Sequence, residues 1–189
     1  MSARKDVINK CLNMEKVVSI SRLDLNGGYD VNKPTIMIVD DFESIIKLFK
    51  RLVKRMNISE NFNIVYSSHS DAGIKVLNEL YHNSDFHIDI LITDITFGGS
   101  IDIGEVHNFS LNGISLAGII KKINPNLIYH FITGHIVSPK ATPTFFDEYR
   151  SYTEDDLLQH LSYKDIPVST NKDLFYSLVK GTRYEMLIK

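Results

Sequence analysis

Polar residues close several apolar runs of this sequence, and their types suit chemistry at phosphorus. Asp40 and Asp41 follow one run, and Asp94 ends another. Thr133 and Lys164 end two later runs. A carboxylate can attack phosphorus to form an acyl phosphate, while a hydroxyl and an ammonium group neutralise phosphoryl oxygens. These five residues predict phosphoryl transfer to an aspartate, with Asp94 as the acceptor.

The acidic residues also predict a metal ion. Three carboxylates within about 5 Å repel one another by roughly 3 kcal/mol per pair at an effective dielectric constant of 20. Because Mg²⁺ relieves this repulsion and prefers oxygen ligands, we expect Asp40, Asp41 and Asp94 to bind it with the backbone carbonyl of Thr96. An Asp-Asp pair alone is more often a helix cap. Only the complete set of residues favours the metal site over that alternative.

The elements that position these residues alternate between strand and helix. Apolar runs predict strands near 36–39, 64–66, 88–94, 127–132 and 158–163. Apolar residues at helical spacing predict helices near 45–56, 70–81, 114–123, 145–150 and 170–180. Parallel neighbours need crossover connections, so the expected fold is α/β with a doubly wound five-stranded parallel sheet. Ligands bind such sheets at the carboxyl ends of the strands, where the polar residues stand.

Composition limits the setting and the partners. The chain has 189 residues, a net charge of −2 and one cysteine, Cys11. The charge favours neither nucleic acid nor anionic lipid as a partner. A single cysteine excludes an internal disulfide and fits a cytoplasmic protein. No run approaches the roughly 20 apolar residues that span a bilayer, and the seven histidines lack zinc or iron spacing.

Three regions are expected along the chain. Residues 1–33 form an N-terminal extension that ends in a turn-rich linker, and a frayed leader is favoured over a short docked helix. Residues 34–182 form the domain. Residues 183–189 form a C-terminal tail that is too short for an effector domain, so output is expected through protein contact.

The motifs at the strand ends resemble those of receiver domains from bacterial response regulators. The matching segments are Ile36–Asp41, Ile90–Asp94, Asn112–Leu116, Phe131–Gly134 and Leu161–Lys164. The resemblance implies a flavodoxin-like sheet in the order 2-1-3-4-5. It also implies that a histidine kinase or histidine phosphotransfer protein donates the phosphoryl group to Asp94 in a Mg²⁺-dependent reaction. The chain would then be a switch that resets by slow self-hydrolysis, rather than a turnover enzyme, and would act on an unknown downstream protein, with a homodimer as one option.

The resemblance also implies roles for residues around the acceptor site. Thr96 and His135, two positions beyond Asp94 and Thr133, would set the lifetime of the phosphoryl group. Gly134 leaves space beside the threonine.

Three features depart from the usual receiver pattern. The loops 97–112 and 135–156 are extended, and the first is long enough to cover the site. No lysine-proline pair follows the last strand, which leaves Lys172 as an alternative to Lys164. Leu161 stands where the switch of the family often has an aromatic residue.

Three other functions compete with a phosphorylated switch. A receiver-like module that acts without phosphorylation needs only the fold. A haloacid-dehalogenase-like phosphohydrolase built on Asp94 also uses Mg²⁺, but it needs a second acid where this chain has Thr96. A flavin-binding electron carrier ranks last, because no phosphate-binding loop follows the first strand.

Overall fold

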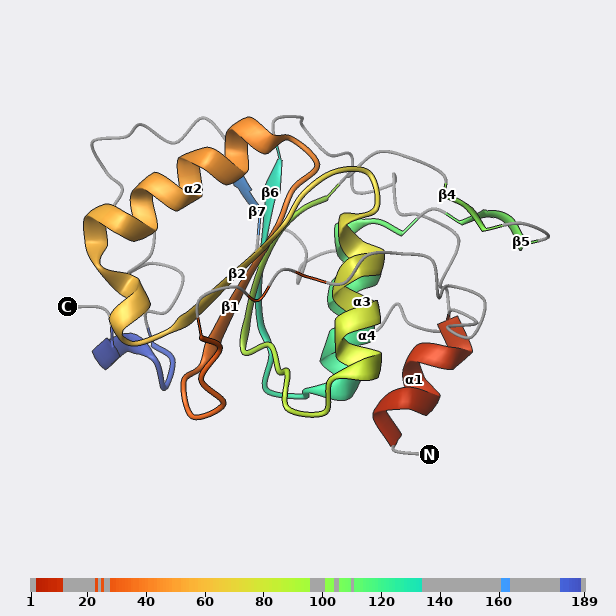
Figure 1. Ribbon diagram of the computed structural model, residues 1–189, viewed down its shortest axis with the longest axis horizontal. Helices are drawn as coiled ribbons and strands as arrows, with labels where there is room; N and C mark the ends of the chain where they lie inside the picture. The colour runs from red at the N-terminus through yellow and green to blue at the C-terminus, as the bar shows by residue number, and fades with distance from the viewer. Residues whose placement is uncertain are drawn as a thin grey trace.

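The computed structural model describes residues 3–11, 23, 25, 28–95, 101–103, 106–109, 111–133, 161–163 and 181–187. Over these residues the chain forms one central sheet with helices on both faces (Figure 1). None of the described helices combines the length and the apolar character that crossing a membrane requires. The helices predicted near 145–150 and 170–180 lie outside the described residues.

The central sheet has five parallel strands. They are β1 (Thr35–Val39), β2 (Asn63–Ser67), β3 (Ile90–Asp94), β6 (Ile128–Thr133) and β7 (Leu161–Tyr163). Their spatial order is β2-β1-β3-β6-β7, and every neighbouring pair is parallel. This confirms the predicted doubly wound sheet in the order 2-1-3-4-5, because these are its first to fifth strands along the chain.

Helices cover both faces of the sheet. They are α2 (Glu43–Met56), which is followed by the short η2 (Ile58–Glu60), α3 (Ala72–His82) and α4 (Gly113–Ile123). Helix α2 lies on one face, and α3 and α4 lie on the other (Figure 1). Successive residues of β1 serve the two faces: Ile36 and Ile38 belong to the core cluster under α2, whereas Met37 and Val39 belong to the cluster under α3 and α4.

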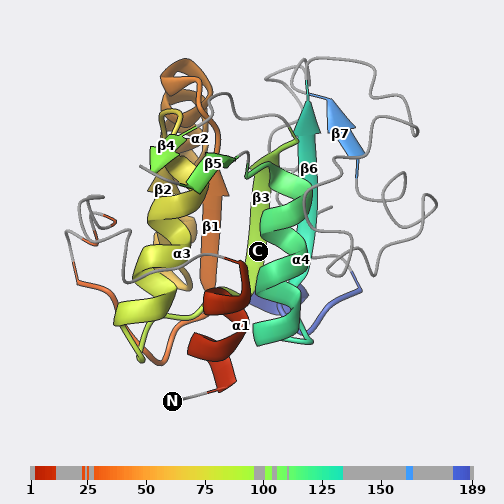
Figure 2. The ribbon, with the colours of Figure 1, turned by 90° about the vertical axis from the view of Figure 1, so that its right-hand side faces the viewer.

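The N-terminal extension contains a docked helix, which is the alternative that the sequence ranked below a frayed leader. Helix α1 (Ala3–Cys11) packs on the outer side of α3 and α4. It contacts the C-terminal ends of these two helices, away from the carboxyl ends of the strands (Figures 1 and 2). Ile8 is fully buried there. A helix of nine residues is marginal by itself, so its apolar face needs a docking surface that the local sequence does not reveal.

The loop 97–112 also contains structure that the sequence did not predict. Strands β4 (Ile101–Ile103) and β5 (Val106–Phe109) form an antiparallel hairpin. The hairpin extends outward on the side of α3 and α4 (Figure 1). The described part of this loop therefore does not extend across the carboxyl ends of the central strands.

The C-terminal residues 181–187 contact the end of the sheet where the central strand β3 begins, although residues 183–189 were expected to be a tail. The Tyr184 hydroxyl donates to the Asp89 carboxylate at 2.7 Å, and the Arg183 guanidinium lies 3.2 Å from the same oxygen. Tyr184 is buried and packs edge-on against Phe62. Burial, and then the hydrogen bond and charge of Asp89, raise the pKa of the Tyr184 hydroxyl. The short helix η5 (Glu185–Leu187) follows.

We expect Tyr184→Phe to lower the free energy of unfolding by about 1–2 kcal/mol, because it removes a donor from the buried carboxylate of Asp89. Arg183→Ala is the matched control, since it removes the other C-terminal contact to the same carboxylate. Its side chain is 58% exposed, and we expect a loss below about 0.5 kcal/mol. Urea unfolding of both variants measures the difference. Equal losses would contradict the larger contribution expected from the Tyr184–Asp89 hydrogen bond.

Candidate functional site

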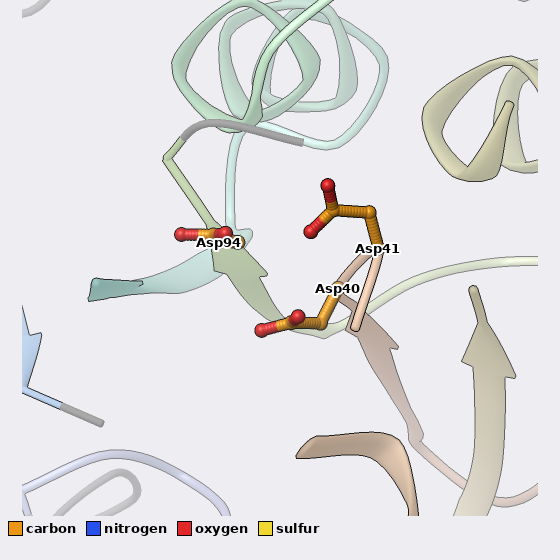
Figure 3. Close-up of side chains that lie close together, drawn as sticks. All are labelled: Asp40, Asp41 and Asp94. Carbon is orange, nitrogen blue, oxygen red and sulfur yellow. The ribbon is translucent and has the colours of Figure 1, made fainter. Parts of the chain in front are cut away.

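Three carboxylates meet at the carboxyl end of the sheet (Figure 3). One oxygen each from Asp40, Asp41 and Asp94 lies within 4.8 Å of the other two. Asp40 and Asp94 are 2% and 3% exposed, and Asp41 is partly exposed. The register of the strands explains the meeting, because Val39 of β1 pairs with Thr93 of β3 and each strand is followed or closed by its aspartate. The structure thus brings together the three acids that the sequence singled out.

The turn after β1 fixes the position of the first two acids. The Asp40 backbone N–H donates to the Ser67 carbonyl at 3.2 Å, which ties the end of β1 to that of β2. The Asp40 carboxylate accepts from the Phe42 backbone N–H at 2.9 Å. This local bond has the form of an Asx turn and leads into α2. Helix initiation therefore accounts for one bond of Asp40, but it does not account for the approach of Asp94.

The start of α4 fixes the backbone around Asp94. The Gly113 N–H donates to the Ile95 carbonyl at 3.0 Å, and the Asn112 side chain caps the helix by accepting from the Ser115 N–H at 2.9 Å. A Cβ atom on Gly113 would lie 2.0 Å from the Asp94 carbonyl oxygen. From the sequence, Gly113 was recognised only as part of a motif, and this close approach to Asp94 was not predicted. A glycine directly after a helix-capping asparagine was the available signal.

The three acids suit a hard divalent cation. At 4.8 Å and an effective dielectric constant of 20, each pair of charges repels by about 3 kcal/mol, so an ion between them would remove a large unfavourable energy. Carboxylate oxygens are the ligands that Mg²⁺ prefers, and it commonly keeps waters at its remaining positions. The donor set therefore fits the ion that the sequence predicted.

The remaining predicted site residues are described only in part. Thr133 is the last residue of β6. The residue before it, Ile132, pairs with Asp94 of β3, and Thr133 itself pairs with Tyr163 of β7. The backbone thus places Thr133 at the same edge of the sheet as the acids. Leu161 begins β7 and pairs with Phe131. The other predicted residues lie outside the described part of the chain: Thr96, Gly134, His135, Lys164 and Lys172.

A basic face, which the net charge conceals, runs along α2. It consists of five exposed cations: Lys47, Lys50, Arg51, Lys54 and Arg55. Lys47 is 3.3 Å from Glu43, and Lys50 lies over the ring of Tyr66. Phe42, between the acids and this face, is 60% exposed. The helix that starts beside the acidic site therefore has an exposed aromatic residue just before it and a row of cations along its length.

Comparison with known proteins gives matches in structure alone. No protein-family model matches the chain, and no curated protein matches it in sequence. The signal receiver domain of a Luxo repressor protein from Vibrio parahaemolyticus matches with a TM-score of 0.52 and 16% identity, covering 83% of this chain and 98% of that one. A response regulator receiver protein from Sinorhizobium medicae matches with a TM-score of 0.50 and 18% identity, covering 79% and 94%.

A third solved structure belongs to a longer protein. The RcsB response regulator from Salmonella typhimurium matches with a TM-score of 0.51 and 17% identity, covering 80% of this chain and 61% of that one. Likenesses at these identities concern the fold. Together with the strand order β2-β1-β3-β6-β7, they show that this chain has the fold of response-regulator receiver domains.

Proposed function

We propose that the chain is a phosphorylation-activated signalling switch that accepts a phosphoryl group on Asp94. One observation carries the proposal: in a receiver fold, the acid that ends the central strand β3 lies within 4.8 Å of two further acids. The proposal assigns no turnover of a small-molecule substrate. The chain would promote its own phosphorylation and slow dephosphorylation.

Each site residue then has a distinct part in the transfer. An oxygen of Asp94 attacks the phosphorus, and the bond between phosphorus and the histidine nitrogen of the donor breaks. Asp40 and Asp41 would hold Mg²⁺ together with Asp94 and the Thr96 carbonyl. The bound ion would neutralise charge on the phosphoryl oxygens.

The other proposed residues stabilise and tune the phosphorylated state. The Thr133 hydroxyl and the Lys164 ammonium would contact the remaining phosphoryl oxygens, with Lys172 as the alternative lysine. Thr96 and His135 would set the lifetime of the acyl phosphate. Gly134 would leave room for the phosphoryl group, and Leu161 would take the place of the aromatic switch residue.

The donor in this proposal is a histidine kinase or a histidine phosphotransfer protein. The basic face of α2 supports a protein donor, because the donor must reach Asp94 and α2 begins at Glu43, two residues after Asp41. Exposed Phe42 offers an apolar anchor beside the site. The cations along α2 suit an acidic surface on the donor and would speed its encounter. We propose a cytoplasmic setting, an unknown downstream protein and a homodimer as the possible active assembly.

Phosphorylation by acetyl phosphate with Mg²⁺, followed by intact mass, tests the proposal. We expect the native protein to gain one phosphoryl group and Asp94→Asn to gain none. Asp85→Asn is the matched control, because Asp85 is an exposed acid in the loop after α3 and should leave labelling unchanged. If the folded native protein gains no mass, the receiver-like module that acts without phosphorylation becomes the better account.

A further inference from the structure

Helix α1 occupies a face formed by α3 and α4. Ile8 is fully buried in the same apolar cluster as the inner residues of α3 and α4, and Val7 packs against that cluster. Leu23 and Leu25, from the segment that follows, contribute to the cluster as well. The face therefore binds a short amphipathic helix through one buried side chain, Ile8, and the adjoining Val7.

Polar contacts orient α1 on this face. The Arg4 guanidinium donates to the Ser84 carbonyl at 3.1 Å and to the Phe86 carbonyl, both in the segment after α3. The Asn9 side chain donates to the Tyr81 hydroxyl at 3.2 Å, and the Lys5 ammonium lies 4.9 Å from the centre of the Tyr81 ring. Directional bonds of this kind specify which helix fits the face and in which direction it lies.

Helix α4 connects this face to Asp94. Its first turn packs directly against the backbone of Asp94 and Ile95, since Gly113 abuts the Asp94 carbonyl and its N–H donates to the Ile95 carbonyl. The eleven residues of α4 form one continuous helix, so a displacement of its first turn carries through to the part that α1 covers.

We propose that the α3–α4 face is a helix-binding surface, and that phosphorylation of Asp94 loosens α1 from it. The inference rests on the proposed function. A phosphoryl group adds negative charge and three oxygens to Asp94. Because α4 abuts the Asp94 backbone with no space to spare at Gly113, a rearrangement of that segment would displace the first turn of α4. Because α1 packs on both α3 and α4, it fits their described arrangement best and binds less well when α4 shifts.

The exposed face would then be free for a partner. The chemistry of α1 defines what fits: an amphipathic helix with a β-branched apolar residue at the centre of its apolar face and an arginine in its first turn. By linkage, the same coupling acts in reverse, so a variant that loosens α1 should favour the phosphorylated state at equilibrium.

Hydrogen exchange of the full chain, followed by mass spectrometry, tests the coupling. We expect the α1 amides to exchange about fivefold faster or more after treatment with acetyl phosphate and Mg²⁺, which is the low end of typical coupling between sites. The α2 amides serve as an internal reference and should change little. Intact mass of the same samples gives the fraction of protein that carries a phosphoryl group.

Variants separate the possible outcomes. Ile8→Ala should raise hydrogen exchange in α1 without phosphorylation. Lys10→Ala should not, because Lys10 is exposed. Asp94→Asn should abolish the increase in α1 exchange on treatment with acetyl phosphate. Arg4→Gln offers a second, milder way to loosen α1 if Ile8→Ala does not fold. Complete phosphorylation with unchanged α1 exchange would overturn this inference and leave the proposed function standing. Absence of a phosphoryl group on the native protein would overturn both.

Discussion

Asp94→Asn is expected to raise the stability of the metal-free protein and to remove its stabilisation by Mg²⁺. The Asp94 carboxylate takes part in two of the three repulsive pairs at the site, each about 3 kcal/mol at an effective dielectric constant of 20. Asparagine keeps the shape and removes the charge. Solvent at the partly exposed Asp41 and the polar contacts of Asp40 and Asp94 within the protein offset part of this repulsion, so we expect a gain of about 2 kcal/mol in the free energy of unfolding.

Urea unfolding in EDTA and in Mg²⁺ measures both effects. The native protein should gain about 2.7 kcal/mol when Mg²⁺ is present at a hundred times its dissociation constant, and Asp94→Asn should gain far less. The control is Asp85→Asn, because Asp85 is an exposed acid in the loop after α3. This variant should behave like the native protein in both buffers. A loss of stability for Asp94→Asn in EDTA would mean that the carboxylate is held by favourable contacts that outweigh the repulsion.

Gly113→Ala is expected to destabilise the protein by about 3 kcal/mol, although alanine is the better helix former. Helix propensity alone would favour alanine by about 1 kcal/mol. The added Cβ would lie 2.0 Å from the Asp94 carbonyl oxygen and 2.9 Å from the Thr93 hydroxyl. The first of these atoms belongs to the backbone of the central strand, so α4 or the acceptor segment must move, and overpacking of this kind costs more than the propensity returns.

Gly28→Ala is the control for this substitution. Gly28 has φ of +92°, and a Cβ there would meet no atom within 4 Å, so only backbone strain of about 1–2 kcal/mol applies. Urea unfolding compares the two variants, and acetyl phosphate labelling should slow in Gly113→Ala because the Asp94 backbone is displaced. A stable Gly113→Ala with native labelling would contradict the close contact between α4 and the acceptor strand.

Local patterns in the sequence were enough to predict the sheet. Apolar runs marked each of the five strands, and the crossover rule for parallel neighbours gave the doubly wound arrangement that the structure confirms. The same rule predicted that the residues closing the strands meet at one edge. Asp40, Asp41 and Asp94 do meet there, because register in a parallel sheet follows from the ends of the buried runs.

Features that depend on distant partners were not predicted. The sequence favoured a frayed leader because a nine-residue helix is marginal alone, and only the face of α3 and α4 stabilises α1. Tyr184 looked like part of a tail, since its partner Asp89 lies 95 residues away along the chain. The hairpin β4–β5 was assigned to a loop because its strands have three and four residues, too short for a clear periodic signal.

The sequence by itself determined which residues close the strands, what chemistry their side chains suit and that the strands form a parallel, doubly wound sheet; their order was implied only by the resemblance to receiver domains. These properties depend on short-range periodicity and on connection rules that hold for any parallel sheet. Only the tertiary structure decided that the three carboxylates approach within 4.8 Å, that Gly113 abuts the Asp94 carbonyl and that α1 covers α3 and α4. Those features arise from packing between segments far apart in the chain, where shape and distance, rather than residue pattern, set the outcome.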